Sequence, residues 1–97
     1  MIKIVAHNYV KAEDVDKAVP IFKELAQKSR AEDGCISYDL FVDKRDAGHI
    51  VIIEGWETKE ALKAHGESAH FAALTGQIRP FAAKEGYMTV MNALDVG

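Results

Sequence analysis

Four stretches of the chain alternate between apolar and polar residues, which is the period-two pattern of half-buried strands. These stretches are residues 1–9, 35–42, 49–56 and 85–92. Between the first two, apolar residues recur every three or four positions from Val15 to Ser29, which predicts a helix with one buried face. Because Pro20 falls inside this pattern, we expect a continuous helix that bends there. Gly34 is expected to end the helix as its C-terminal cap.

The second helical region is predicted to consist of two pieces. Thr58 is a good N-cap for the first piece, which Gly66 weakens, and Ser68 begins a second that Pro80 closes. Residues 43–48 contain the turn residues of a hairpin that joins the second and third strands.

The resulting order is β-α-β-β-α-β, which predicts one α+β domain over residues 1–97. This is the ferredoxin-like pattern, a four-stranded antiparallel sheet with its helices on one face. We expect the first and third strands to be parallel neighbours. The opposite face of the sheet is too apolar for solvent, so we expect a second copy to cover it in a two-fold homodimer. Its apolar residues are Val5, Phe41, Val51, Ile53, Tyr87 and Met91.

Composition narrows the class of protein. With 48% hydrophobic and 28% charged residues, the chain is expected to be a soluble globular domain. A net charge of −3 with scattered lysines and arginines argues against a nucleic-acid partner. The apolar runs are too short for a bilayer, and the start lacks a signal-peptide pattern. The single cysteine, Cys35, allows no internal disulfide, so we expect a cytoplasmic protein without a membrane partner.

Candidate chemistry is concentrated in residues 50–71 and in the first strand. Asn8 and Trp56 end strands that we expect to be parallel neighbours, with both side chains toward the helices. They could then hold a planar ring at one edge of a pocket between sheet and helices. The alternatives are an ordinary core aromatic for Trp56 and a strand-end turn residue for Asn8.

An acidic residue and two histidines share the same region. Glu54 is an inward carboxylate that needs a partner, such as a nearby histidine or a backbone amide. His65 and His70 would lie roughly 140° apart on one regular helix, although a break at residues 66–68 could bring them together. Because Glu54 is the one further ligand in view, no metal site is expected. A base or hydrogen-bonding role for one histidine stands beside a structural role.

Other reactive side chains receive simpler interpretations. Tyr38 either lines the pocket with its hydroxyl or is a core aromatic. His7 and His49 fall on the other alternation and are expected at the surface or at a dimer edge. Cys35 is expected to be a buried, inert thiol. The sequence contains no glycine-rich phosphate loop, serine nucleophile elbow or paired-cysteine motif, so no nucleotide cofactor is expected.

These motifs resemble those of the antibiotic biosynthesis monooxygenase family over nearly the whole chain. The most specific part is Glu54-x-Trp56 followed by His65-x4-His70-Phe71. Further matching segments are Gly34-Cys35 through Tyr38 to Asp43, and the first strand with Asn8.

The resemblance implies a dimeric α/β barrel of ferredoxin-like subunits, each with a pocket. The family includes cofactor-independent monooxygenases, haem-degrading enzymes and an isomerase of a phosphorylated sugar. The haem-degrading members share Asn8 and Trp56 but have an axial histidine near Thr75, which this chain lacks. We therefore expect a cofactor-free monooxygenase that oxidises a quinol or related small aromatic, with dioxygen as co-substrate. The alternatives are an isomerase of a small carbonyl metabolite and a non-catalytic small-molecule-binding dimer.

By this resemblance, the site residues fall into two groups. The expected catalytic residues are Asn8, Trp56 and His65. The expected substrate-binding residues are Tyr38, Glu54, His70 and Phe71.

Overall fold

The computed structural model describes all 97 residues and contains four strands and three helices. In chain order these are β1 (Ile2–Val10), α1 (Val15–Arg30), β2 (Cys35–Asp43), β3 (Asp46–Trp56), α2 (Lys59–Gly66), α3 (Ala69–Ile78) and β4 (Ala82–Asn92). Short 3-10 turns at Ala12–Asp14 and Arg79–Phe81 precede α1 and β4. The order confirms the ferredoxin-like fold predicted from the alternation pattern.

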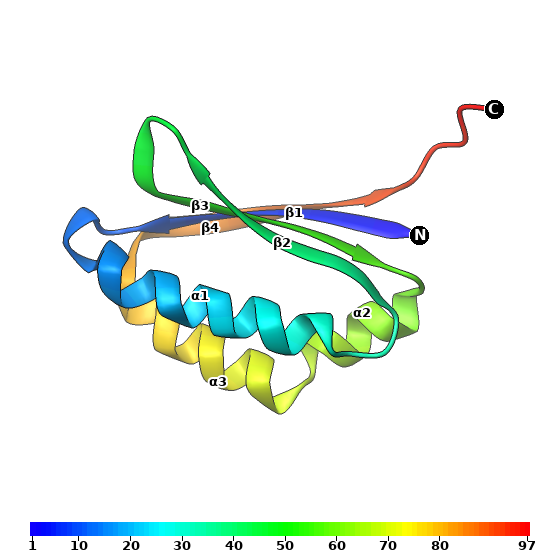
Figure 1. Ribbon diagram of the computed structural model, residues 1–97, viewed down its shortest axis with the longest axis horizontal. Coiled ribbons are helices and arrows are strands. Elements are labelled where there is room, and N and C mark those ends of the chain that lie inside the picture. The colour runs from blue at the N-terminus through cyan, green and yellow to red at the C-terminus, as the bar shows by residue number, and fades with distance from the viewer.

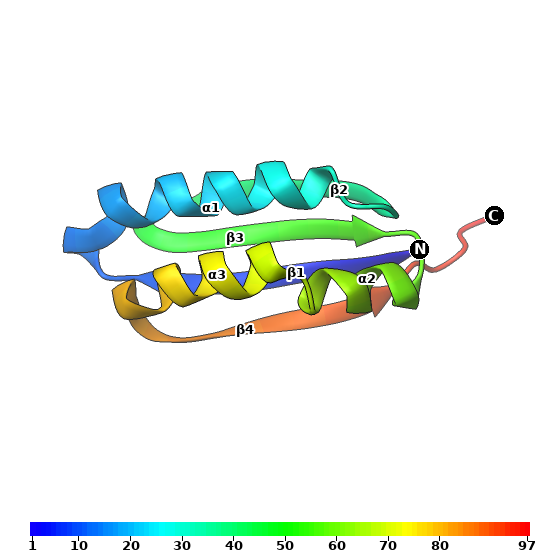
Figure 2. The same cartoon turned by 90° about the horizontal axis from the view of Figure 1, so that it is seen from below.

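The strands form one sheet in the order β2-β3-β1-β4, and every neighbouring pair is antiparallel. All three helices lie on the same face of the sheet, and the opposite face carries no helix (Figure 1). Seen from the helix side, α1 runs alongside β2 and β3, while α2 and α3 follow each other over β1 and β4 (Figure 2). The molecule is therefore a two-layer domain with one bare face.

The predicted parallel pairing of the first and third strands is wrong. In the antiparallel β1–β3 register, Ile2 is opposite Trp56 and Asn8 is opposite Ile50. The crossover through α1 returns β2 parallel to β1, and the hairpin then inserts β3 between them in the reverse direction. Asn8 is thus six residues from the β1 position that faces Trp56, about 20 Å along the strand.

Helix α1 runs without interruption through Pro20, as predicted, but it ends before Gly34. Its last residue is Arg30, and the capping residue Ala31 has ordinary right-handed backbone angles. Gly34 instead forms the turn into β2 with a φ of 81°. Its carbonyl accepts a hydrogen bond of 2.8 Å from the Glu57 amide, which ties the turn to the end of β3.

Replacing Gly34 by alanine should destabilise the domain. An added Cβ would lie 2.5 Å from the Ala61 Cβ, and the left-handed backbone itself costs a residue with a side chain about 1–2 kcal/mol. We expect the free energy of unfolding in urea to fall by at least that amount. Gly66→Ala is the matched control, because a Cβ there meets nothing within 4 Å at the end of α2. Equal losses in both variants would contradict this account.

The hydrophobic core lies between the sheet and the helices. Trp56, Tyr38 and Phe22 are among its largest fully buried side chains. On the bare face, Phe41 and Tyr87 remain more than half exposed. Both faces of β4 are open, since Met88 and Val90 on its helix-side face are also more than half exposed. No helix combines the length and apolar character needed to cross a membrane.

Candidate active site

A cavity of about 500 Å³ lies on the helix side of the sheet, a volume suited to a small organic molecule. Its walls come from all four strands and all three helices and are mostly apolar, with Ile4, Phe22, Ile52 and Phe71 as examples. Several polar side chains interrupt this apolar lining. They include Asn8, Tyr38, Glu54, His65 and Thr75.

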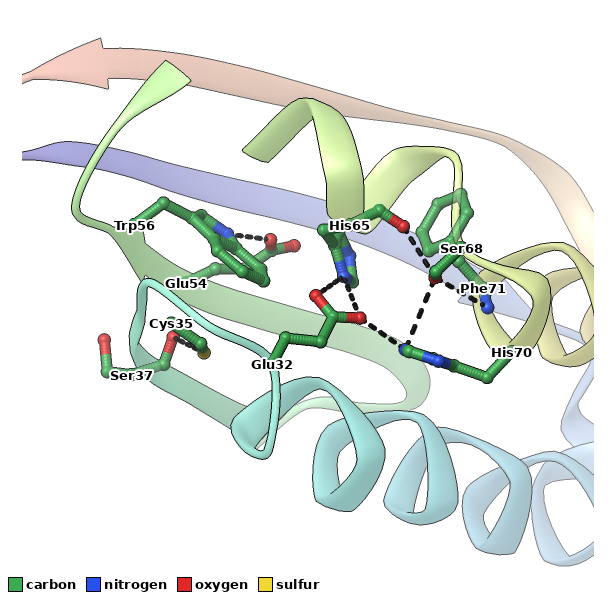
Figure 3. A network of polar contacts seen from close by, with 9 residues as sticks. All are labelled: Glu32, Cys35, Ser37, Glu54, Trp56, His65, Ser68, His70 and Phe71. Carbon is green, nitrogen blue, oxygen red and sulfur yellow. Dashed lines mark hydrogen bonds and ion pairs between the residues drawn. The ribbon is translucent and has the colours of Figure 1, made fainter. Parts of the chain in front are cut away.

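His65 is the most constrained polar group in the cavity wall. It lies in the last turn of α2, is only 3% exposed, and packs against the Trp56 ring at a centroid distance of 4.7 Å. Its Nδ1 lies 3.0 and 3.2 Å from the two carboxylate oxygens of Glu32 (Figure 3). Because an ionised carboxylate only accepts hydrogen bonds, Nδ1 carries a proton. Nε2, buried and without a hydrogen-bond partner, is then free to accept one.

Glu32 was missed by the sequence-based prediction. It lies in the loop after α1, and its Oε1 also contacts Nε2 of His70 at 2.5 Å. Both histidines therefore converge on one carboxylate, which confirms that the helix break can bring them together. Ser68 builds the break, since its hydroxyl donates to the His65 carbonyl at 2.8 Å and accepts from the Phe71 amide at 3.3 Å. An acidic residue in a loop carried no signal that could identify Glu32 beforehand.

Glu54 has a partner, but the partner is Trp56 rather than a histidine or backbone amide. The indole Nε1 donates a hydrogen bond of 2.9 Å to Oε1 of this carboxylate, which is 6% exposed. Burial raises the pKa of Glu54, and the negative charge of Glu32 acts in the same direction. The Trp56 hydrogen bond and the charge of His65 oppose that rise. The net effect is a carboxyl whose pKa is above its ordinary value, close to a histidine.

Five of the seven predicted site residues line the cavity: Asn8, Tyr38, Glu54, His65 and Phe71. Trp56 and His70 are not part of the lining. The expected meeting of Asn8 with Trp56 is wrong, since the antiparallel register puts them at opposite ends. Asn8 donates instead to the Ile50 carbonyl at 3.3 Å. Trp56 is wholly buried behind His65 and supports the site from outside the cavity.

Two further side chains near the site are held in their neutral forms. Burial strongly raises the pKa of Tyr38, and the charge of Glu54 adds to the effect. The phenol therefore keeps its proton and can act as a hydrogen-bond donor. Burial also raises the pKa of the half-buried Cys35, with contributions from Glu32 and Glu54. A thiol that resists ionisation is a poor nucleophile, in line with the inert role expected for it.

The other two histidines lie on the opposite face of the sheet. His7 Nδ1 lies 2.9 Å from His49 Nε2, and His49 Nδ1 lies 3.0 Å from Asp43 Oδ2. The Tyr87 ring stacks on His7 at 4.5 Å between centroids. The pKa of Asp43 is lowered, mainly by the backbone amide of Arg45 and then by His49. This cluster belongs to the bare face, as predicted for both histidines.

Known proteins are similar to this chain in both sequence and fold. Residues 1–76 match the family described as antibiotic biosynthesis monooxygenase. The protein YcnE of Bacillus subtilis (strain 168) is 38% identical over 71 residues, which cover 73% of this chain and 75% of YcnE.

Solved structures extend the likeness to the whole fold. A crystal structure of an antibiotic biosynthesis monooxygenase superimposes with a TM-score of 0.94 at 38% identity, covering 98% of this chain and 100% of the other. Rv0793 from Mycobacterium tuberculosis superimposes with a TM-score of 0.90 at 26% identity, covering 97% and 95%. The fold, the sequence match and the coverage of both chains agree, and this chain belongs to the antibiotic biosynthesis monooxygenase family.

Proposed function

We propose that the protein is a monooxygenase that needs no cofactor and oxidises a quinol or a related small aromatic with dioxygen. The observation that carries this proposal is the buried His65–Glu32 pair, with the unpartnered Nε2 of His65 in the wall of an apolar cavity. Family membership supports the reaction class but does not specify the substrate.

In this mechanism His65 acts as the base. Its Nε2 takes the proton of a substrate hydroxyl, and Glu32 on Nδ1 stabilises the imidazolium that forms. Apolar walls such as Phe71 exclude water from the resulting electron-rich anion. Tyr38, held as a neutral phenol, is available to donate a hydrogen bond to a developing oxygen anion. One residue, His65, thus removes the proton, and another, Tyr38, stabilises the anion.

The electrons come from the substrate. The quinol anion passes one electron to dioxygen, and the resulting superoxide and semiquinone combine to form a carbon–oxygen bond at a ring carbon. The His65 imidazolium returns its proton to the peroxide, whose oxygen–oxygen bond then breaks with loss of the ring hydrogen as water. The balance is quinol plus O₂ giving a hydroxylated quinone plus water. No external reductant enters.

The test is oxygen uptake with menadiol as the probe, in metal-free buffer and against the autoxidation rate without protein. We expect protein-dependent uptake, with one atom of labelled dioxygen in the quinone product and no hydrogen peroxide. Uptake equal to the autoxidation control, across several quinols and polycyclic phenols, overturns the proposal. Uptake that yields peroxide and an unlabelled quinone indicates an oxidase instead.

An isomerase of a small carbonyl metabolite is the second candidate. The observation that favours it is Glu54, a carboxyl with a raised pKa beside the base His65, since enolisation needs a proton acceptor and a proton donor together. Such an enzyme consumes no oxygen but exchanges a substrate proton with deuterated water. A binding protein does neither, yet its melting temperature rises with the ligand.

We propose further that the bare face of the sheet packs against a second copy. Its apolar side chains, which include Phe41, Val51 and Ile53, have no cover from the helices, and Phe41 is 53% exposed. A chain of 97 residues also has a modest core of its own, so burying this face adds stability.

The dimer is tested by a charge placed in the face. Val51→Lys, opposite Phe41 in the register, should convert a species of twice 10.7 kDa into single chains, because a buried lysine has no partner there. Light scattering at micromolar concentration measures the mass. The matched control is Ala73→Lys on the exposed side of α3, which should leave the mass unchanged. A wild-type mass of one chain removes the dimer.

A further inference from the structure

We propose that Glu32, His65 and His70 form a binding site for a divalent transition metal, with Zn²⁺ as the best-matched ion. Their ligand atoms lie within 4.8 Å of one another and come from three separate segments of the chain. Two imidazoles and one carboxylate form a ligand set that suits zinc and other first-row metals. Glu32, which the sequence-based prediction missed, supplies the third ligand.

The separations are compatible with a single ion. Ligand atoms of one tetrahedral zinc lie about 3.3 Å apart, because each bond is about 2.0–2.2 Å long. Glu32 already lies 3.0 Å from His65 and 2.5 Å from His70. The carboxylate lies between the two imidazoles, and the His65 and His70 ring centroids are 6.4 Å apart (Figure 3). Side-chain rotations of about an ångström therefore replace two hydrogen bonds with metal bonds.

Burial and charge favour a bound ion over direct hydrogen bonds between Glu32 and the two histidines. The side chain of His65 is 4% exposed, whereas those of Glu32 and His70 are 17% and 23% exposed, which leaves the ion a path from solvent. Glu54, which is 6% exposed, adds a second carboxyl group to the neighbourhood of His65. A divalent cation offsets the negative charge of the carboxylate that it binds. Three protein ligands also leave one position for water or a small molecule.

An ion in this site changes what His65 offers to the cavity. Metal bonded to Nδ1 moves the imidazole proton to Nε2, which then donates a hydrogen bond where it otherwise accepts a proton. The metal and the proposed base therefore compete for one ring. Bound Zn²⁺ should inhibit a reaction that depends on Nε2 as a base, although the metal site itself does not depend on that reaction.

The experiment is titration of the EDTA-treated, dialysed protein with Co²⁺ as a spectroscopic stand-in for Zn²⁺. We expect one ion per chain, visible absorption bands of a four- or five-coordinate cobalt site, and their loss on adding Zn²⁺. Glu32→Gln and His70→Asn should each weaken binding on the order of 100-fold or more, since each removes one of three protein ligands. His49→Asn removes an imidazole of the bare-face cluster and should leave binding unchanged.

Two results overturn the metal site. One is a spectrum of six-coordinate, hydrated cobalt, and the other is binding that survives Glu32→Gln and His70→Asn but is lost in His49→Asn. Circular dichroism of each variant establishes that it is folded. The readout is independent of turnover, so a protein that consumes no oxygen can still pass this test. A monooxygenase that never binds metal can equally fail it.

Discussion

Replacing His65 by alanine should reduce quinol-dependent oxygen uptake by roughly 10²- to 10⁴-fold, the usual contribution of a positioned base. The variant removes the one cavity-lining imidazole whose orientation is fixed by a carboxylate. Substrate binding should change much less, because the apolar walls of the cavity remain. The substitution should therefore lower kcat and leave KM nearly unchanged. Initial rates of oxygen consumption over a range of menadiol concentrations separate the two.

Three further variants keep this result interpretable. His65→Gln preserves most of the side-chain volume, so activity lost in both variants reflects lost basicity rather than a collapsed core. Glu32→Gln leaves the imidazole in place but removes the charge on its Nδ1 side, and a smaller loss of kcat is expected. His49→Ala, on the bare face, should retain full activity. A His65→Ala protein that is folded and as active as wild type would rule out His65 as the base.

Alternation of apolar and polar residues was sufficient to predict the order of the elements. It works because a strand of an antiparallel sheet commonly buries one face, so a period of two identifies the strand and the side chains that point to one face of the sheet. The capping residues Thr58 and Ser68 were also predicted correctly. Each accepts the backbone hydrogen bond expected of an N-cap, from Ala61 and Phe71 respectively.

The relative direction of the strands and the role of loop residues were harder to predict. The parallel pairing of β1 with β3 was an error of topology, and it carried Asn8 to the wrong end of the sheet. Gly34 was assigned to the nearest helix end, although its positive φ serves a turn that packs against Ala61. In both cases the deciding contact is between segments distant in sequence. Local patterns hold little information about such contacts.

In the candidate site too, local patterns identified some residues, and contacts between distant segments decided the others. Residues within the two motifs, such as Glu54 and His65, could be named because a charged or titratable group interrupts an apolar pattern. Glu32 lies 33 residues before His65, in a loop where acidic residues are common. Its importance arises only when the fold brings the loop against the break between α2 and α3. The partner of Glu54 was likewise decided by packing, since the indole of Trp56 reaches the carboxylate first.

Truncating Trp56 should have the largest effect on stability of any substitution considered. Trp56→Ala removes a fully buried ring and should lower the free energy of unfolding by about 3–5 kcal/mol. Trp56→Phe keeps much of the volume but leaves the buried Glu54 carboxylate without its donor, at a cost of about 1–3 kcal/mol. Since Trp56 is the chain's single tryptophan, urea unfolding must be followed by circular dichroism rather than fluorescence.

The Trp56→Phe loss should depend on pH in a definite direction. The pKa of Glu54 is raised in the folded state, so ionising this carboxyl destabilises the fold. This loss of stability is absent below the pKa of the unfolded state and is complete above the pKa of the folded state. Losing the Trp56 hydrogen bond, which lowers this pKa, raises it further in the variant. The difference in stability from wild type should therefore grow from about pH 4 to pH 7.

The double variant Trp56→Phe/Glu54→Leu isolates that carboxylate. Once the buried acid is also replaced by an apolar side chain of similar size, no carboxylate remains that lacks its hydrogen-bond donor. Its stability should therefore recover toward wild type, and the pH dependence of the Trp56→Phe loss should disappear. A Trp56→Phe loss that is constant with pH, and that persists unchanged in the double variant, would assign the effect to packing alone. The Trp56–Glu54 bond would then contribute nothing to holding the wall behind His65.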